Sequence, residues 1–126
     1  MEVIKYSAED RTPYVFFDGD KGILDIEGRC VPEDAKQFFK ELQKQLDIYG
    51  ETPSKNLDVT INLEYFNTAT AKELMAMMYK FKNFPTTVTW CHELRDQDMI
   101  DVEKILKKFL VQLLSSLKKW KDNVKS

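Results

Sequence analysis

The stretch from Leu57 to Met78 reads LDVTINLEYFNTATAKELMAMM, and its periodicity changes half-way along. In its first half apolar and polar residues alternate, which predicts a strand with one buried and one polar face. In its second half apolar residues recur every three or four positions, which predicts a helix with one buried face. A strand followed directly by a helix is the repeating unit of an α/β fold.

Four further strands are predicted on either side of this unit. Tyr14–Phe17 and Ile23–Glu27 are apolar and β-prone, and the loop between them contains two glycines. Two such runs around a glycine-containing loop predict an N-terminal β-hairpin. Val3–Tyr6 is a shorter candidate strand. Thr86–Cys91 is rich in β-branched residues and is expected to be the last strand.

A first helix is predicted between the hairpin and Leu57. Pro32 is suited to the first helical turn, and the acidic Glu33 and Asp34 suit the positive end of the helix dipole. Gly50 is expected to end this helix. The residues of its buried face recur at spacings of three and four: Ala35, Phe38, Phe39, Leu42, Leu46 and Tyr49.

The segment from about Asp98 to Trp120 is predicted to be one long helix. Its apolar face comprises Val102, Ile105, Leu106, Phe109, Leu110, Leu113, Leu114 and Leu117. A local excess of lysines accompanies it: Lys104, Lys107, Lys108, Lys118, Lys119, Lys121 and Lys125. A helix of this kind either covers a sheet or binds an anionic membrane or a partner groove. We favour the covering role, because the apolar face is what a sheet-covering helix needs.

These elements predict an α/β fold with a mixed four- to five-stranded sheet and helices packed mainly on one face. The 126 residues, of which 43% are hydrophobic and 32% charged, are expected to form a single domain over residues 1–126. The net charge of −2 gives no electrostatic case for binding nucleic acid. No apolar run is long enough for a membrane span and no signal peptide is evident, so we expect a cytoplasmic protein.

The residue inventory argues against catalysis, a metal or a cofactor. Two cysteines without paired spacing and a single histidine do not predict a zinc site. No phosphate-binding glycine motif occurs. Cys91 and His92 are neighbours on a predicted strand, where their side chains point to opposite faces and cannot form a catalytic dyad. Cys30 and Cys91 are therefore expected to be unreactive buried thiols.

The turn between the Leu57 strand and its helix allows two interpretations. Asn67 is a suitable N-cap, whose side-chain oxygen accepts a hydrogen bond from the backbone N–H of Ala69 or Thr70. Capping alone explains the turn structurally. Thr68, the first helical residue, is also a suitable phosphoacceptor, because anions are favoured at a helix N-terminus. A phosphate there adds roughly −1.5 to −2 charges without requiring a change of fold.

Four motifs in one order resemble the SiaC family of bacterial regulatory phosphoproteins. They are TPYVFFD, GILDIEGRCVPEDAKQFF, EYFNTATAKELM and VTWCHELRDQDM, and the resemblance covers roughly Thr12 to Ile100. The family's fold is similar to the STAS domain of anti-sigma factor antagonists. After Met99 the pattern departs from the family: a short final strand is expected there, whereas Ile105 to Trp120 is predicted to be uninterrupted helix.

The resemblance implies a regulatory mechanism and no enzymatic activity. In the family a Ser/Thr kinase phosphorylates a hydroxyl residue at the start of the helix, and a PP2C-type phosphatase removes the phosphate. The unmodified form binds and activates a diguanylate cyclase, which links it to cyclic-di-GMP signalling and biofilm control. Thr68 falls on the phosphoacceptor position, with Thr70 as the alternate acceptor. The implied switch surface consists of Tyr65, Asn67, Thr70 and Lys72.

A second function remains open from the sequence. The chain is alternatively a constitutive interaction module, which uses its long amphipathic C-terminal helix for self-association or membrane-surface binding. The two hypotheses differ in whether the hydroxyl at Thr68 is needed.

Overall fold

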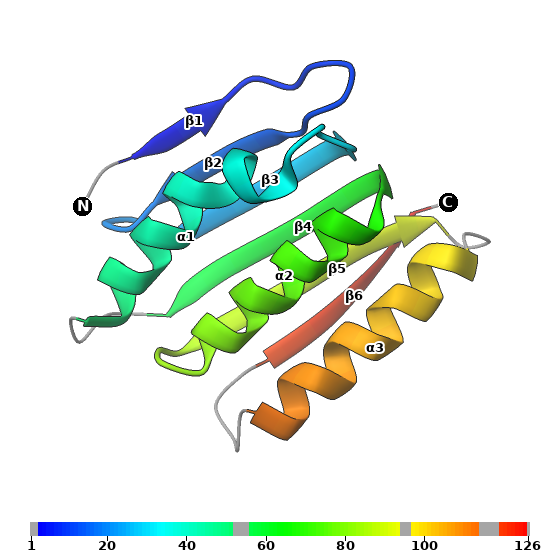
Figure 1. Ribbon diagram of the computed structural model, residues 1–126. Coiled ribbons are helices and arrows are strands. Elements are labelled where there is room, and N and C mark those ends of the chain that lie inside the picture. Colours follow the sequence, from blue (N-terminus) through cyan, green and yellow to red (C-terminus); the bar gives the residue numbers. More distant parts are fainter. Residues whose placement is uncertain (1–2, 52–55, 94–96, 114–118, 126) are drawn as a thin grey trace.

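Figure 1 shows the computed structural model, which describes residues 3–51, 56–93, 97–113 and 119–125. These residues form β1 (Ile4–Tyr6), β2 (Tyr14–Asp18), β3 (Ile23–Cys30), α1 (Ala35–Glu51), β4 (Leu57–Phe66), α2 (Thr68–Phe81), β5 (Thr86–Glu93), α3 (Gln97–Leu113) and β6 (Lys119–Lys125).

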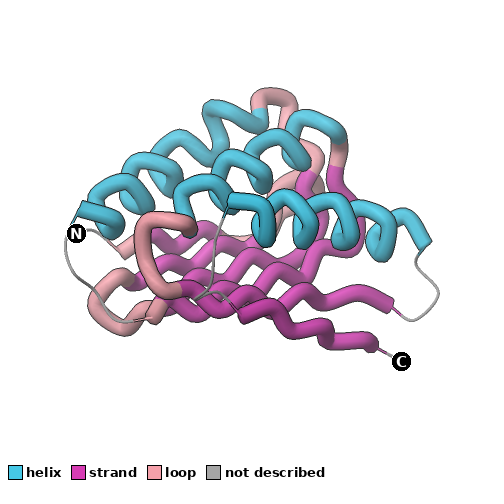
Figure 2. The backbone as a smooth tube through the Cα atoms, turned by 90° about the horizontal axis from the view of Figure 1, so that it is seen from below, coloured by secondary structure: helices cyan, strands magenta, loops and turns pink. Residues whose placement is uncertain are grey.

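The strands form one six-stranded sheet in the order β1-β2-β3-β4-β5-β6. β1, β2 and β3 are antiparallel neighbours, whereas β3 to β6 are parallel. Parallel neighbours need a crossover connection, and α1, α2 and α3 provide the three that are required. All three helices lie on one face of the sheet (Figure 2). The predicted fold class, a mixed sheet with an N-terminal hairpin and helices on one face, is confirmed.

The alternation predicted for the central strand is the alternation observed. Leu57, Val59, Ile61 and Leu63 on β4 are at most 1% exposed and face the helices, while the polar residues between them lie on the opposite face. The helices supply the other half of the core, chiefly through Phe39, Leu42, Leu46, Tyr49, Leu74, Met78 and Phe81. This packing fixes β4 and α2, and so determines the position of the turn between them.

The prediction of an uninterrupted helix to Trp120 is wrong. α3 is described to Leu113, and Lys119–Lys125 forms strand β6, which pairs in parallel with β5. The sheet therefore has six strands rather than four or five, and the final strand expected for the family is present. Trp120 and Val124, four residues apart, are compatible with a helix and with a strand, and the open edge of β5 decides between them. Leu114, Leu117 and Lys118 lie outside the described residues.

Two predictions about α1 also need correction. The helix begins at Ala35, after Pro32, and Asp34 caps it by accepting the backbone N–H of Gln37 on its carboxylate at 3.0 Å. Gly50 does not end the helix, which continues to Glu51. A Cβ atom at Gly50 would lie 3.4 Å from the ring of Phe84, so the glycine allows close packing there.

Candidate functional site

A β-bulge lies at the end of β4, just before the turn that leads into α2. The register pairs Gly28 with Leu63 and then Arg29 with Tyr65, so Glu64 is the extra residue on β4. Gly28 has a φ of +120°, a conformation that favours glycine. A bulge of this kind shifts the alternation of the strand by one residue and re-aims the side chains that follow.

The shifted alternation sends the last two side chains of β4 in different directions. Phe66 packs against the core, with its ring centroid 6.3 Å from that of Trp90. Tyr65 is 56% exposed, and few other large apolar side chains among the described residues are exposed to this extent. The bulge thus places an aromatic side chain on the surface beside the turn, where exposed Tyr residues often contribute to interfaces.

The β4–α2 turn, residues Asn67–Thr70, has the cap geometry predicted for it. Asn67 has extended backbone angles, and its side-chain oxygen accepts the backbone N–H of Thr70 at 2.9 Å. Its carbonyl accepts the first helical hydrogen bond, from the N–H of Ala71, at 3.0 Å. α2 begins at Thr68, whose side chain is exposed. Thr68 therefore lies at the positive end of the helix dipole, in contact with solvent.

Thr70 lies on the inner side of the turn and is 0% exposed. Its hydroxyl donates to the carbonyl of Cys30 at 3.1 Å, and its Oγ1 lies 3.4 Å from the Cys30 sulfur. The hydroxyl thereby joins the start of α2 to the end of β3. A kinase must reach the oxygen that it phosphorylates. The burial of Thr70 therefore argues against two predictions: that Thr70 is an alternate phosphoacceptor, and that it is part of the exposed switch surface.

Cys30 has the properties of a structural thiol. Burial raises the pKa of Cys30 to about 11, and the hydrogen bond with Thr70 opposes this shift in part. Because the thiolate is the reactive form, a thiol with so high a pKa is unreactive at neutral pH. The side chain fills core volume below the turn.

Lys72 and Thr68 are four residues apart on α2, and both are exposed. Residues at this spacing are neighbours on a helix surface. A lysine ammonium one turn along the helix is in range of an anion held at Thr68. Two of the four residues of the implied switch surface, Tyr65 and Lys72, are exposed. Asn67 is half-buried and Thr70 is buried.

A hollow of about 280 Å³ adjoins the turn. It is lined by Glu64, Tyr65, Phe66, Asp98, Met99 and Val102. Its last three residues come from the first turns of α3, so two segments that are distant in the sequence form one surface. Sequence reasoning did not associate α3 with this site. The acidic residues Glu64 and Asp98 give the hollow a negative rim.

The structure separates the one pair that resembled a catalytic dyad. His92 Nε2 lies 3.6 Å from Glu103 Oε1, on the helix-covered face. Cys91 lies on the other face, where its sulfur is 3.5 Å from the Asn123 side-chain nitrogen on β6. The prediction that the two side chains point apart is confirmed. Within the part of the chain that the structure describes, no cluster of three or more potential metal ligands occurs.

Comparison with known proteins places this geometry in a family. The chain matches the SiaC family of regulatory phosphoproteins over residues 6–119. It belongs to that family. The match covers the β4–α2 turn, α3 and the first residue of β6, so the SiaC-family pattern extends beyond the range of the motifs. No relative was found among curated protein sequences.

Solved structures of SiaC proteins share the fold. SiaC of Pseudomonas aeruginosa aligns with a TM-score of 0.81 and 17% identity, covering 99% of this chain and 100% of that one. The apo-SiaC structure from the same organism gives 0.81 and 15%, over 100% of both chains. A third structure holds the diguanylate cyclase SiaD in complex with its activator SiaC, again from P. aeruginosa; it aligns at 0.80 with 17% identity over 97% and 99%. At these identities the comparison shows the fold.

Among the described residues, no helix has the length and apolar character needed to cross a bilayer.

Proposed function

We propose that this chain is a phosphorylation-switched adaptor without catalytic activity of its own. A Ser/Thr kinase phosphorylates Thr68, a PP2C-type phosphatase removes the phosphate, and the unmodified chain binds and activates a diguanylate cyclase. Membership of a family of regulatory phosphoproteins and the SiaD–SiaC complex of the structural relative support this proposal. The observation that carries the assignment to Thr68 is its exposure at the start of α2, two residues before the buried Thr70.

The folded chain tolerates a phosphate at Thr68. The group extends from the first residue of α2, where backbone N–H groups have no intrahelical acceptor and anions are favoured. The Lys72 ammonium, one turn along the same helix, adds a charge-assisted contact. Phosphorylation therefore changes the surface and leaves the core under the turn as it was.

The same phosphate opposes binding of the cyclase. In this proposal the client covers Tyr65, Thr68 and the hollow beside them. A phosphate adds roughly −1.5 to −2 charges next to the negative rim formed by Glu64 and Asp98. Covering that charge with a partner removes it from water, and the single Lys72 ammonium does not offset the desolvation penalty unless the partner supplies a further cation.

A kinase assay with matched variants tests the acceptor. Intact-mass measurement after incubation with the cognate kinase and ATP should show one added phosphate on the wild type and on Thr68→Ser, and none on Thr68→Ala. Thr68→Ser keeps a hydroxyl at the position and is the control for general effects of substitution. Full phosphorylation of Thr68→Ala would overturn the assignment.

A binding assay tests the direction of the switch. Thr68→Asp adds a charge and Thr68→Asn has nearly the same shape without one. We expect Thr68→Asp to weaken binding to the cyclase at least about tenfold, in the range typical for an uncompensated interfacial charge, and Thr68→Asn to bind within about threefold of the wild type. Equal affinities of Thr68→Asp and Thr68→Asn would contradict the electrostatic mechanism.

The alternative of a constitutive module based on α3 has less support. Met99 and Val102 pack against the hydrophobic core, and Glu103 is buried. The described first half of α3 is thus used to cover the sheet. Ile105 is 61% exposed, but one exposed apolar residue among the α3 side chains that the structure describes does not make an interface.

A further inference from the structure

One face of the sheet is not covered by any helix that the structure describes. All three helices lie on the other face (Figure 2), and the side chains of each strand alternate between the two faces. Over β4 and β5 the uncovered face carries polar side chains such as Thr60, Asn62 and Thr89. Over β2 and β3 it also carries half-buried apolar side chains: Tyr14, Phe16 and Ile23. The apolar part of this face therefore lies on the antiparallel side of the sheet.

The strands β1, β2 and β3 place three different side chains in one row across that part of the face. The register pairs Lys5 with Phe16, and Phe16 with Asp25. The residue that precedes each of them in its strand is at most 4% exposed and belongs to the core, so the three side chains point away from the helices. The row thus consists of a cation on β1, an aromatic ring on β2 and a carboxylate on β3.

The two charges of the row have no partner of opposite charge among the described residues. Lys5 is exposed and Asp25 is half-buried. Burial raises the pKa of Asp25, and so does the neighbouring Glu27 carboxylate, while a hydrogen bond from the Thr60 hydroxyl opposes the shift in part. The Asp25 carboxylate therefore lies where an added cation is favourable, and the described chain does not supply one.

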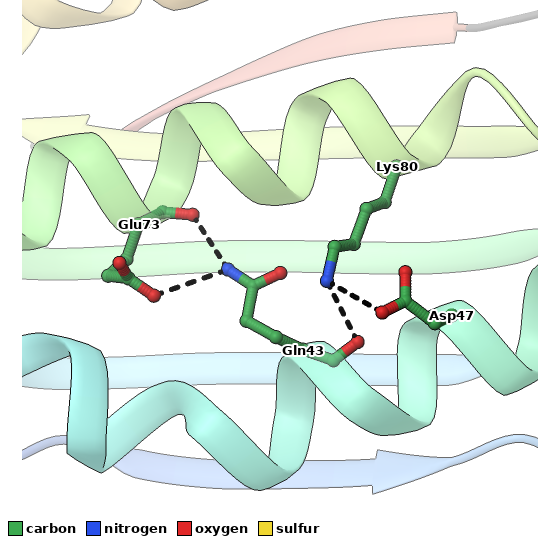
Figure 3. Close-up of polar contacts among 4 residues, drawn as sticks. All are labelled: Gln43, Asp47, Glu73 and Lys80. Atoms are coloured by element: carbon green, nitrogen blue, oxygen red, sulfur yellow. Dashed lines mark hydrogen bonds and ion pairs between the residues drawn. The ribbon is translucent and has the colours of Figure 1, made fainter.

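The helical side of the molecule differs in this respect. Between α1 and α2 the Lys80 ammonium donates to the Asp47 carboxylate at 3.1 Å, and the Gln43 amide nitrogen donates to the Glu73 carboxylate at 3.4 Å (Figure 3). These polar groups are partnered within one chain. In the row on the sheet, by contrast, the ring of Phe16 lies between the two charges.

The row is complementary to a second copy of itself. A two-fold axis that runs along β2, between two stacked sheets, places β1 of each chain opposite β3 of the other. Phe16 then meets Phe16 of the second copy, and Lys5 of each chain lies opposite Asp25 of the other. Stacked sheets are about 10 Å apart and cross at about 30°. At one strand from the axis this crossing shifts Lys5 relative to Asp25 by only about 2.5 Å, which a long lysine side chain accommodates.

The residues beside the row follow the same symmetry. Val3 directly precedes β1, is 56% exposed, and continues the alternation of the buried Ile4 and the exposed Lys5. Val3 and Ile23 each lie two residues before a member of the row, so the axis places Val3 of one chain opposite Ile23 of the other. An axis across the strands would instead place Lys5 opposite Lys5. Only the axis along β2 matches cation with carboxylate and apolar with apolar side chains.

We propose that two copies of this chain form a weak symmetric dimer through the Lys5–Phe16–Asp25 row of the uncovered sheet face. The overlap of three strands measures about 14 by 17 Å, far below the roughly 800 Å² per partner of a stable complex. The dimer is therefore of the transient class and forms at high concentrations of the chain. β4, β5 and β6 of each chain lie outside the overlap, so the dimer leaves the β4–α2 turn of each chain uncovered.

Exchange of charges between the two chains tests the pairing. Sedimentation equilibrium at about 0.05–1 mM chain and about 50 mM salt should show an average mass that rises with concentration towards that of two chains. Lys5→Glu alone and Asp25→Lys alone should each weaken self-association at least about tenfold, because their dimers contain two like-charge contacts. An equimolar mixture of the two variants should associate within about threefold of the wild type, because both contacts regain opposite charges.

Two further variants separate this patch from general effects of charge. Lys40→Glu makes the same charge change as Lys5→Glu, but on α1, and should self-associate within about twofold of the wild type. Phe16→Thr removes the ring at the axis without changing the charge, and should weaken self-association at least about fivefold. Thermal unfolding followed by circular dichroism verifies that each variant is folded.

Three results would overturn the proposal. A wild-type chain that stays monomeric up to about 1 mM would show that the face does not pair with itself. Wild-type self-association of Lys5→Glu and Phe16→Thr would assign the dimer to another surface. A mixture of folded Lys5→Glu and Asp25→Lys that associates no better than its components would show that these two residues do not face each other across the interface.

Discussion

The two sides of the β4–α2 turn differ more than its sequence suggests. Thr68 and Thr70 have the same side chain and lie two residues apart, yet one is exposed and the other is completely buried. Residues that are two positions apart in a helix lie about 200° apart around its axis, so Thr68 and Thr70 face opposite directions. The inner side, with Thr70 and Cys30, holds the turn in place. The outer side, with Thr68 and Tyr65, is exposed to solvent, so we expect an added charge there to leave the fold undisturbed.

The largest difference between the two sides is expected for an added charge. Thr70→Asp should lower the free energy of unfolding by about 3–5 kcal/mol, or prevent folding, because it buries a carboxylate without a cation. Thr68→Asp should leave it unchanged or raise it by up to about 1 kcal/mol, because an acid at a helix N-terminus is favourable. Urea unfolding followed by circular dichroism measures both. Equal stability of the two variants would abolish the distinction between the sides.

Removal of a hydroxyl should give a smaller difference in the same direction. Thr70→Val keeps the shape and leaves the Cys30 carbonyl without this donor, so the free energy of unfolding should fall by about 1–3 kcal/mol. Thr68→Val removes an exposed hydroxyl and should change it by less than about 0.5 kcal/mol. If Thr70→Val proved as stable as the wild type, the bond to Cys30 would not be holding the turn.

The cap lies between the two sides and should have an intermediate effect. Asn67→Ala removes the acceptor for the Thr70 N–H and should lower the free energy of unfolding by about 1 kcal/mol. Asn67→Asp retains an acceptor oxygen and is the matched control, with stability close to that of the wild type. A loss in Asn67→Asp as large as that in Asn67→Ala would mean that the amide group itself, and not the cap, matters.

The Cys30 thiol below the turn should affect the pH dependence of stability only at alkaline pH. The pKa of Cys30 is about 11 in the folded chain, against 9.0 for a solvent-exposed thiol, so the unfolded chain loses this proton first as the pH rises. Its contribution to stability is complete below pH 9 and is lost as the pH rises towards 11. At pH 10 the loss should be about 1 kcal/mol. Chemical unfolding at pH 8 and pH 10 measures the fall in the free energy of unfolding between the two pH values, which should be larger by this amount in the wild type than in Cys30→Ala. An equal fall in both proteins would show that Cys30 is not a buried, protonated thiol.

Local patterns predicted the parts of the fold that local physics determines. The alternation in Leu57–Leu63 and the spacing after Asn67 determine which faces are buried, and the cap needs only residues within one turn. The bulge at Glu64 was not predictable in this way, because it depends on the register with Gly28 on a different strand. It is the bulge that exposes Tyr65, so its exposure could not be read from the pattern of β4 alone.

The remaining differences arise from contacts that are distant in the sequence. The burial of Thr70 depends on Cys30, forty residues away, and a helical wheel drawn from Ala71 and Leu74 does not place it decisively. Strand β6 forms because its backbone pairs with the edge of β5. The hollow beside the turn combines residues from β4 and α3, so the sequence of neither segment alone predicts it.

The composition of the two edge strands limits how this sheet can grow. At one edge β1 has only three residues, and at the other β6 carries lysines at positions 119, 121 and 125. Short edge strands and edge lysines discourage the docking of a further strand. Polymerisation through main-chain hydrogen bonds is therefore disfavoured at both edges of the sheet, and this protects the folded chain from aggregation through its strands.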